Sequence, residues 1–111
     1  MLDFLNKFTN GEPNIELILG NRYAYSSAGK RIGVAVFADE GSRITLNYIR
    51  SDIKGTGACS RLIEALKTYA DKKKIPIIVE WMSNEIAPYL ENRGFQVFPS
   101  DNRFDGYATY P

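Results

Sequence analysis

Hydrophobic and polar residues alternate along the first half of the chain in a pattern that predicts strands. Residues 14–19 and 22–26 are strand-like segments joined by a Gly20-Asn21 turn, and residues 31–37 form a more continuous apolar segment. Within residues 43–50, apolar and polar side chains alternate, so one face can pack while the other contacts a ligand. The pattern predicts a meander of four strands.

A helical period replaces this alternation after residue 57. The apolar side chains that recur at helical spacing are Ala58, Leu62, Ile63, Leu66, Tyr69 and Ala70. This spacing predicts a helix over about residues 58–73, and the segment 75–81 that follows is apolar on both faces. Such a segment is typical of a central parallel strand reached by a helical crossover. The order predicts one strand-helix-strand unit.

The two ends of the chain complete the predicted element order. Residues 1–8 carry apolar side chains at helix-like spacing, and Gly and Pro within residues 9–13 interrupt that pattern. Towards the other end, the sequence predicts a helix over residues 84–92 and strands over 95–98 and 106–110. These elements flank the strand-helix-strand unit.

A glycine loop, Lys54-Gly55-Thr56-Gly57, joins the fourth strand to the long helix. The first amides of a helix lack intrahelical partners and carry partial positive charge, so an anion fits there, and glycines let the backbone approach it. A phosphate loop requires Gly-Lys-Ser/Thr and a dinucleotide fingerprint requires three spaced glycines, and neither is present. A tight turn that uses its glycines for geometry alone explains the two glycines equally well.

Composition limits the classes of function. The 111 residues are 44% hydrophobic and 24% charged, which predicts a single globular domain over residues 1–111. No apolar run approaches about 20 residues and no secretory signal starts the chain, so the cytoplasm is the expected compartment. One cysteine and no histidine argue against an internal disulfide, a typical metal site and a serine-histidine triad. The net charge of +1 provides no general attraction to nucleic acid.

The loop with its flanks resembles motif A of the GNAT superfamily of acyl-CoA-dependent N-acyltransferases. That motif reads Arg/Gln-x-x-Gly-x-Gly/Ala after a strand ending in an aliphatic residue, and here Ile49 precedes Lys54-Gly55-Thr56-Gly57-Ala58-Cys59. Lys54 replaces Arg/Gln and keeps the charge without the planar fork, and Cys59 is bulkier than the usual Gly/Ala. The resemblance therefore implies that the anion bound by this glycine loop is the pyrophosphate of coenzyme A.

A second stretch, from Asn84 to Phe95, resembles motif B of the same superfamily. Its reference pattern is Asn-x-x-Ala followed by Tyr-Glu-Lys-x-Gly-Phe, and Gly94-Phe95 matches the end of that pattern. Counting back from Gly94, Leu90 fills the usual tyrosine position and Tyr89 comes one residue earlier. Together the two motifs cover roughly residues 31–98.

The resemblance implies an α/β fold with a mixed, mostly antiparallel sheet, a central βαβ unit, two splayed parallel strands and helices on both faces. It implies acetyl-CoA as cofactor, with its acyl arm between the splayed strands. The implied cofactor-binding residues are Asn47, Tyr48 and Ile49 for the arm, Lys54, Gly55, Thr56, Gly57, Ala58, Cys59 and Ser60 for the pyrophosphate, and Asn84 of the second motif. Family members usually have two helices between the first two strands, where this chain has a turn. The acceptor side is therefore open or completed by a partner subunit, as in a homodimer.

Two residues are candidates for proton transfer. An amine is mostly protonated at neutral pH, so a base should assist, and Glu80 interrupts an apolar strand near the expected wedge, where burial would shield it from water. A solvent-facing residue or an ion pair explains Glu80 as well. Tyr89 is the nearest phenol to protonate the thiolate, and its alternative role is core packing. For Cys59, packing is favoured over covalent catalysis because the chain has no histidine base.

The sequence thus predicts an N-acetyltransferase that moves an acetyl group to an amine of a small molecule or protein. The alternative is a catalytically weak or inactive protein of the same fold that acts as an acyl-CoA sensor or a protein-binding module. A third hypothesis is nucleic-acid recognition through Arg43, Arg50 and the tyrosines Tyr23 and Tyr25, which would have to be exposed.

Overall fold

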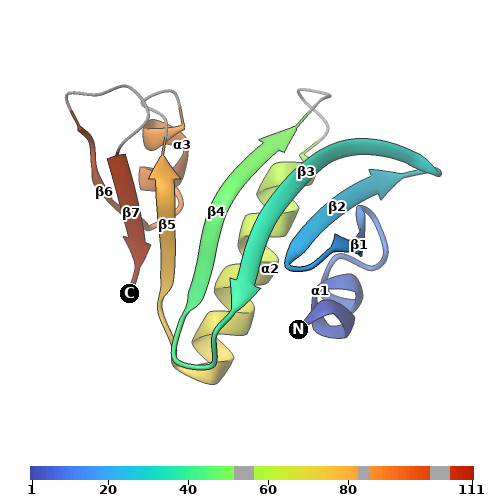
Figure 1. The fold of residues 1–111 in the computed structure, drawn as a ribbon, viewed down its shortest axis with the longest axis horizontal. Coiled ribbons are helices and arrows are strands. Elements are labelled where there is room, and N and C mark those ends of the chain that lie inside the picture. Colours follow the sequence, from blue (N-terminus) through green and yellow to red (C-terminus); the bar gives the residue numbers. More distant parts are fainter. Residues whose placement is uncertain (52–56, 83–85, 101–105) are drawn as a thin grey trace.

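A computed structural model describes residues 1–51, 57–82, 86–100 and 106–111. Its elements run in the order α1 (Leu2–Phe8), β1 (Asn14–Leu19), β2 (Arg22–Ser27), β3 (Lys30–Asp39), β4 (Ile44–Ser51), α2 (Ala58–Lys73), β5 (Ile77–Met82), α3 (Ala87–Glu91), β6 (Gln96–Phe98) and β7 (Gly106–Tyr110). In the described part of the chain these strands form one sheet in the order β1-β2-β3-β4-β5-β7-β6 (Figure 1). None of the described helices is both long and apolar enough to cross a membrane.

The sheet is antiparallel except at β4 and β5, which run parallel. Helix α2 connects these two strands and therefore forms the crossover of the predicted βαβ unit. Its bounds agree with the helical period in the sequence, and every apolar residue of that period is buried. The helix ends at Lys73. The next residue, Lys74, has a left-handed backbone, and its amide donates to carbonyls of the last helical turn.

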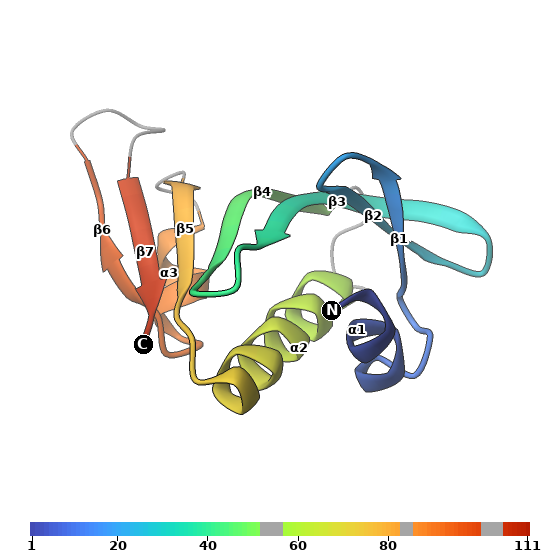
Figure 2. The same cartoon turned by 60° about the horizontal axis from the view of Figure 1, so that its bottom comes forward.

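All three described helices pack on one face of the sheet (Figure 2). Leu5 of α1, Leu66 of α2 and Leu90 of α3 belong to a single core cluster with buried residues of β4 and β5. The fold class is confirmed, but the expectation of helices on both faces is wrong. The reason is that β1 and β2 are joined only through Gly20 and Asn21, so no helix is inserted there to cover the second face. We call this uncovered side the helix-free face.

Helix α1 is attached to the edge strand β1 through one side chain. The amide of Asn6 donates to the carbonyl of Ile15 at 2.7 Å, and its oxygen accepts from the Ile15 amide at 2.6 Å. The hydroxyl of Thr9 donates to the Pro13 carbonyl at 2.9 Å and closes the connecting turn. The predicted first helix and the break after it are both present.

Candidate active site

Strands β4 and β5 pair over only a short stretch and then separate. Their parallel ladder ends with Leu46 opposite Val79, although β4 continues to Ser51 and β5 to Met82. Figure 1 shows the two strands diverging towards their carboxyl ends. The backbone of β4 beyond Leu46 is therefore not paired with β5, in agreement with the splayed strands that the resemblance implies.

A bulge coincides with this separation. Tyr48 pairs with Val36 and Leu46 pairs with Phe37, so Asn47 is an extra residue with no partner on β3. Bulges interrupt ladder hydrogen bonds and redirect side chains. The Asn47 amide turns towards β5 and donates a hydrogen bond to Oε2 of Glu80 at 2.6 Å.

Glu80 lies on the helix-free face. Its neighbour Val79 is buried in the core, whereas Glu80 itself is exposed. The shielding from water that the sequence predicts for this carboxylate is absent, because none of the described helices covers this face. Water can therefore reach the carboxylate directly and carry protons to and from it.

Two aromatic side chains lie on the strands beside Glu80. Tyr48 is 44% exposed and Trp81 is 62% exposed, which is unusual for residues of their size. Ile49 is partly buried against the core. Exposed aromatic groups next to a carboxylate provide apolar contact area for a ligand. Trp81 was not predicted as a site residue, although its place at the end of an apolar strand is a signal in the sequence.

The start of α2 lies at the end of the glycine loop. Gly57 has a left-handed backbone with φ of 76° and precedes the first helical turn formed by Ala58, Cys59 and Ser60. This turn has no acidic residue, and no side chain caps the helix in the part of the chain described. The guanidinium of Arg61 lies near Gly57, since a Cβ there would come within 3.8 Å of Nη2. Positive charge is therefore concentrated at this helix end.

Tyr89 of α3 contacts that first turn. Its hydroxyl donates to Oγ of Ser60 at 2.9 Å, and Nη2 of Arg93 donates to the same oxygen at 2.9 Å. The Arg93 guanidinium carbon also lies 3.6 Å from the Tyr89 ring centre. Burial raises the pKa of Tyr89 to about 12, so the phenol stays protonated at neutral pH. Burial likewise raises the pKa of the Cys59 thiol, while the neighbouring Tyr89 hydroxyl opposes that shift.

The family comparison agrees with this geometry. A model described as an acetyltransferase (GNAT) domain matches residues 12–111. The chain belongs to the GNAT acetyltransferase family. The family resemblance inferred from the two sequence motifs is thereby confirmed. No curated protein matches the sequence significantly.

Solved GNAT structures share the fold at low sequence identity. The ribosomal-protein-S18-alanine N-acetyltransferase of Escherichia coli is 17% identical with a TM-score of 0.59, over 79% of this chain and 64% of that one. The PaiA N-acetyltransferase of Thermoplasma acidophilum, solved with coenzyme A, is 11% identical with a TM-score of 0.61. The match covers 94% of this chain and 65% of that one. The N-acetylglutamate synthase of Neisseria gonorrhoeae, solved with coenzyme A and N-acetyl-glutamate, is 14% identical with a TM-score of 0.60. The match covers 97% of this chain and 32% of that one.

This GNAT chain brings its sequence-predicted residues into two groups on opposite faces. Asn47 and Glu80 meet on the helix-free face, whereas Cys59 and Ser60 meet Tyr89 on the helix-covered face. Lys54, Gly55, Thr56 and Asn84 lie outside the described residues. Arg93 was missed, although its spacing of four residues from Tyr89 on a helical segment is the signal that could have revealed it.

Leu90, at the usual tyrosine position of the GNAT motif, is fully buried in the core. Its neighbour Tyr89 is only partly buried and contacts the first turn of α2. The phenol available near the glycine loop is therefore Tyr89, one residue before the family position.

The geometry does not support nucleic-acid recognition through the predicted residues. Tyr25 is 1% exposed and Tyr23 stacks on Phe37 with 4.3 Å between ring centres, so neither offers a free ring to a base. Arg43 forms an ion pair of 3.1 Å with Glu40 just before β4, at the opposite end of that strand from Arg50. These groups do not form one surface.

Proposed function

We propose that this GNAT chain is an acetyl-CoA-dependent N-acetyltransferase that acts on an amine of a small molecule or a protein. The observation that carries the proposal is the separation of β4 and β5 beyond Leu46 and Val79, next to the start of α2. The coenzyme A in the Thermoplasma and Neisseria structures supports the same cofactor. The thioester of acetyl-CoA supplies the activated acetyl group.

The backbone of Asn47, Tyr48 and Ile49 binds the acyl arm in this proposal. These residues follow the last pair with β5, so their main-chain groups on that side are not used by the ladder. Gly57, Ala58, Cys59 and Ser60 direct helix amides to the pyrophosphate, and Arg61 adds charge beside them. Lys54, Gly55, Thr56 and Asn84 remain part of the proposed cofactor-binding set.

Glu80 removes the proton of the acceptor amine, directly or through water. The Asn47 amide holds one carboxylate oxygen at 2.6 Å and leaves the other oxygen for the proton. The neutral nitrogen then forms a bond to the acetyl carbon as the carbon–sulfur bond breaks. The nitrogen loses two protons in all, one to Glu80 before it attacks and one as the amide forms. The sulfur gains one proton from Tyr89, Tyr89 is reprotonated, and the remaining proton leaves to solvent, so the reaction balances.

Tyr89 protonates the departing sulfur. Its pKa of about 12 keeps the hydroxyl protonated, and its hydrogen bond to Ser60 orients it at the first turn of α2. Arg93, which contacts both Tyr89 and Ser60, fixes that orientation. Arg93 is thus a positioning residue in the proposal.

The alternative function is acyl-CoA binding without turnover. Two observations favour it: Leu90 occupies the usual acid position in the core, and Glu80 is exposed to water. A sensor would retain the cofactor site on β4 and α2 without needing either proton-transfer group.

One pair of measurements separates the two functions. With acetyl-CoA and a mixture of amines and peptides, an enzyme releases free thiol and produces a substrate heavier by one acetyl group. A sensor is stabilised against heat by acetyl-CoA but releases no thiol above the background rate. Absence of stabilisation by any acyl-CoA would refute both functions.

A further inference from the structure

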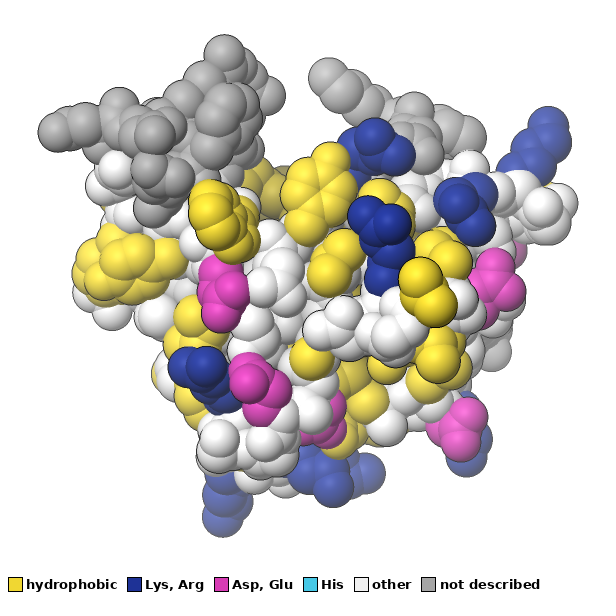
Figure 3. Space-filling view, in the orientation of Figure 1, with side chains coloured by type: hydrophobic (Ala, Val, Ile, Leu, Met, Phe, Trp, Pro, Cys, Tyr) yellow, Lys and Arg dark blue, Asp and Glu magenta, His cyan; other side chains and the backbone are white. Residues whose placement is uncertain are grey.

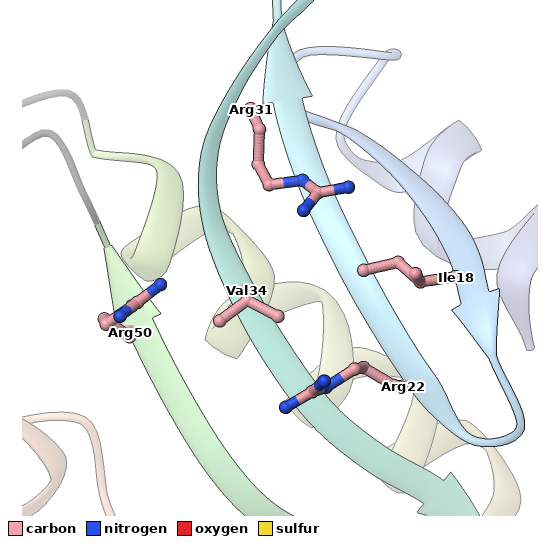
Figure 4. A pocket seen from close by; sticks show the side chains of 5 residues that line it. All are labelled: Ile18, Arg22, Arg31, Val34 and Arg50. Atoms are coloured by element: carbon pink, nitrogen blue, oxygen red, sulfur yellow. The ribbon is translucent and has the colours of Figure 1, made fainter.

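A small cavity of about 190 Å³ opens on the helix-free face (Figure 4). It is lined by Arg22 of β2, Arg31 and Val34 of β3, Arg50 of β4 and Ile18 of β1. In Figure 4 the three guanidinium groups surround Val34, and the helices lie behind the sheet. Figure 3 shows basic and hydrophobic side chains side by side over this part of the sheet. We call these five residues the arginine pocket.

The strand register explains why the arginines meet. Val34 is paired with Arg50, and Arg22 is paired with Val36, so these four side chains point to the same face. Arg31 is on the opposite side of the Val34 position from Arg22, near the start of β3. The three arginines therefore come from different strands, but their side chains lie around the same apolar residue, Val34.

Two arginines of this pocket, Arg22 and Arg31, carry positive charge that the described carboxylates do not neutralise. Glu16 stands in the same cross-strand row through Ala24 and Val34, but no ion pair joins it to Arg22 or Arg31. The guanidinium groups of Arg22 and Arg31 have no hydrogen-bond or ion-pair partner among the described residues. Guanidinium groups bind carboxylates in a bidentate fashion, so the surface fits an anionic occupant.

We propose that the arginine pocket binds acidic side chains of a peptide whose amine is acetylated at Glu80. This inference rests on the proposed transferase function and names its acceptor class. Tyr48 lies between Glu80 and the arginine pocket, since it shares a cross-strand row with Val36 and Arg22 on the same face. Its exposed ring supports the connecting stretch of peptide.

The spacing sets where the acidic residues belong. The Glu80 carboxylate contacts the side chain of Asn47 on β4. From there, β3 is one strand spacing away, about 5 Å, and Arg50 is three residues further along β4, about 10 Å. The Glu80 carboxylate and the pocket are therefore roughly 11 Å apart, which an extended peptide spans with about four residues. The preferred acceptor carries Asp or Glu at about the third to fifth residue from the reacting amine.

The arginine pocket itself offers no aromatic ring on which a base could stack, and the exposed ring of Tyr48 lies outside its five residues. Ile18 and Val34 form the apolar part of the arginine pocket, whereas single strands are held by bases stacked on aromatic rings. Tyr25 is buried and Tyr23 is stacked on Phe37, so neither ring is available beside the arginines. An acidic peptide needs only the charge and the open face.

The first test measures binding without catalysis. Fluorescence anisotropy is recorded for labelled pentapeptides with a blocked amine, carrying either two glutamates or two glutamines at the fourth and fifth positions. The glutamate peptide is expected to bind more tightly, and Arg22→Gln with Arg31→Gln is expected to weaken its binding roughly tenfold. Arg43→Gln is the matched control, because Arg43 pairs with Glu40 away from the pocket. Unchanged binding by the double variant, or tighter binding of a single-stranded oligonucleotide of equal charge, would overturn the proposal.

The second test measures acetyl transfer to the same peptides with free amines. The double variant is expected to raise the KM for the glutamate peptide roughly tenfold, with unchanged kcat and unchanged KM for acetyl-CoA. Equal KM values for the glutamate and glutamine peptides would overturn the acceptor class while the transferase function stands. Binding of the acidic peptide without transfer to any amine would refute the transferase function and, with it, the acceptor role, but would support the pocket as an acidic-peptide site.

Discussion

The side-chain amide of Asn47 donates a hydrogen bond to Oε2 of Glu80 at 2.6 Å, one residue beyond the last pair of β4 and β5. It links the two strands through side chains where the backbone ladder has ended. The contact is exposed, so its contribution to stability is small. The contact matters for position, because it holds the Glu80 carboxylate beside the part of β4 that is not paired with β5.

Replacing Glu80 by Gln tests its role as base. Glutamine keeps the size and a hydrogen-bonding oxygen but cannot accept the amine proton, so we expect kcat/KM for acetyl transfer to fall by about 10²-fold or more. Thermal stabilisation by acetyl-CoA should persist. Glu64→Gln is the control, since Glu64 is an exposed residue of α2 paired with Lys67. Equal rates for the Glu80 and Glu64 variants would show that Glu80 is only a surface carboxylate.

Tyr89→Phe removes the proposed acid but keeps the ring against Arg93. We expect kcat to fall while KM for acetyl-CoA changes little, because the hydroxyl acts on the departing sulfur. Since the pKa of Tyr89 is raised to about 12, the hydroxyl of the natural protein should remain protonated up to about pH 11. Activity lost between pH 8 and 10 in the natural protein but not in Tyr89→Phe would contradict this assignment.

Cys59 should be dispensable for chemistry. Burial raises the pKa of its thiol, so little thiolate exists at neutral pH and alkylation by iodoacetamide should be slow. We expect Cys59→Ala to retain acetyl transfer to within a few-fold of the natural protein. An acetylated Cys59 detected by mass spectrometry after brief mixing with acetyl-CoA would instead indicate covalent catalysis.

Much of the fold was accessible from the sequence because its periodicities are strong. The predicted helix over 58–73 has the same bounds as α2, and the turn at Gly20-Asn21 joins β1 and β2 as expected. The third helix is shorter than predicted within the described residues, beginning at Ala87. Its Pro88 is compatible with the first turn of a helix, and this explains a start close to that residue.

The detailed site could not be read from the sequence because it depends on strand register. Asn47 and Glu80 are 33 residues apart, and they meet only because of a bulge that no local pattern marks. The arginine pocket likewise requires three arginines on separate segments to share a face. One further bulge, between Tyr25 and Ser26, shifts the register on which that arrangement depends.

The Asp39–Tyr69 pair predicts how stability varies with pH. The Tyr69 hydroxyl donates to Asp39 at 2.6 Å, which raises the pKa of Tyr69 to about 12 and lowers the pKa of Asp39. The tyrosine contribution is complete below about pH 10, its unfolded value, and is lost as pH rises towards 12. The Asp39 contribution is present above about pH 4 and is lost as pH falls below it.

Tyr69→Phe should therefore reduce stability by about 1 kcal/mol at pH 7 and weaken the pH dependence at both ends. Urea unfolding between pH 3 and 11 measures this, with Tyr107→Phe as a control on an exposed residue of β7. If Tyr69→Phe lost as much free energy of unfolding at low pH as the natural protein does, the hydrogen bond from Tyr69 would not be what holds Asp39 ionised.

Gly33→Ala should destabilise the protein by about 1–3 kcal/mol, because a Cβ at that position would overlap the Tyr25 ring and the Arg50 carbonyl. The Tyr25 hydroxyl donates to that carbonyl and thereby holds the end of β4. Tyr25→Phe alone should cost about 1 kcal/mol. Combined with Gly33→Ala, it should cost less than the sum of the two, since removing the hydroxyl relieves part of the overlap. Strict additivity in urea unfolding would contradict this packing.

Asn6 also determines how copies of this chain can meet. Its side chain occupies both the amide and the carbonyl of Ile15 on β1, which is the position an incoming strand would need. Exposed strand edges are a common route to aggregation, and here one edge is occupied at Ile15 while β6 at the other edge spans only three residues. Helix α1 thus prevents another strand from pairing with β1 at Ile15. Without α1, β1 would be open to pairing with a strand of another molecule.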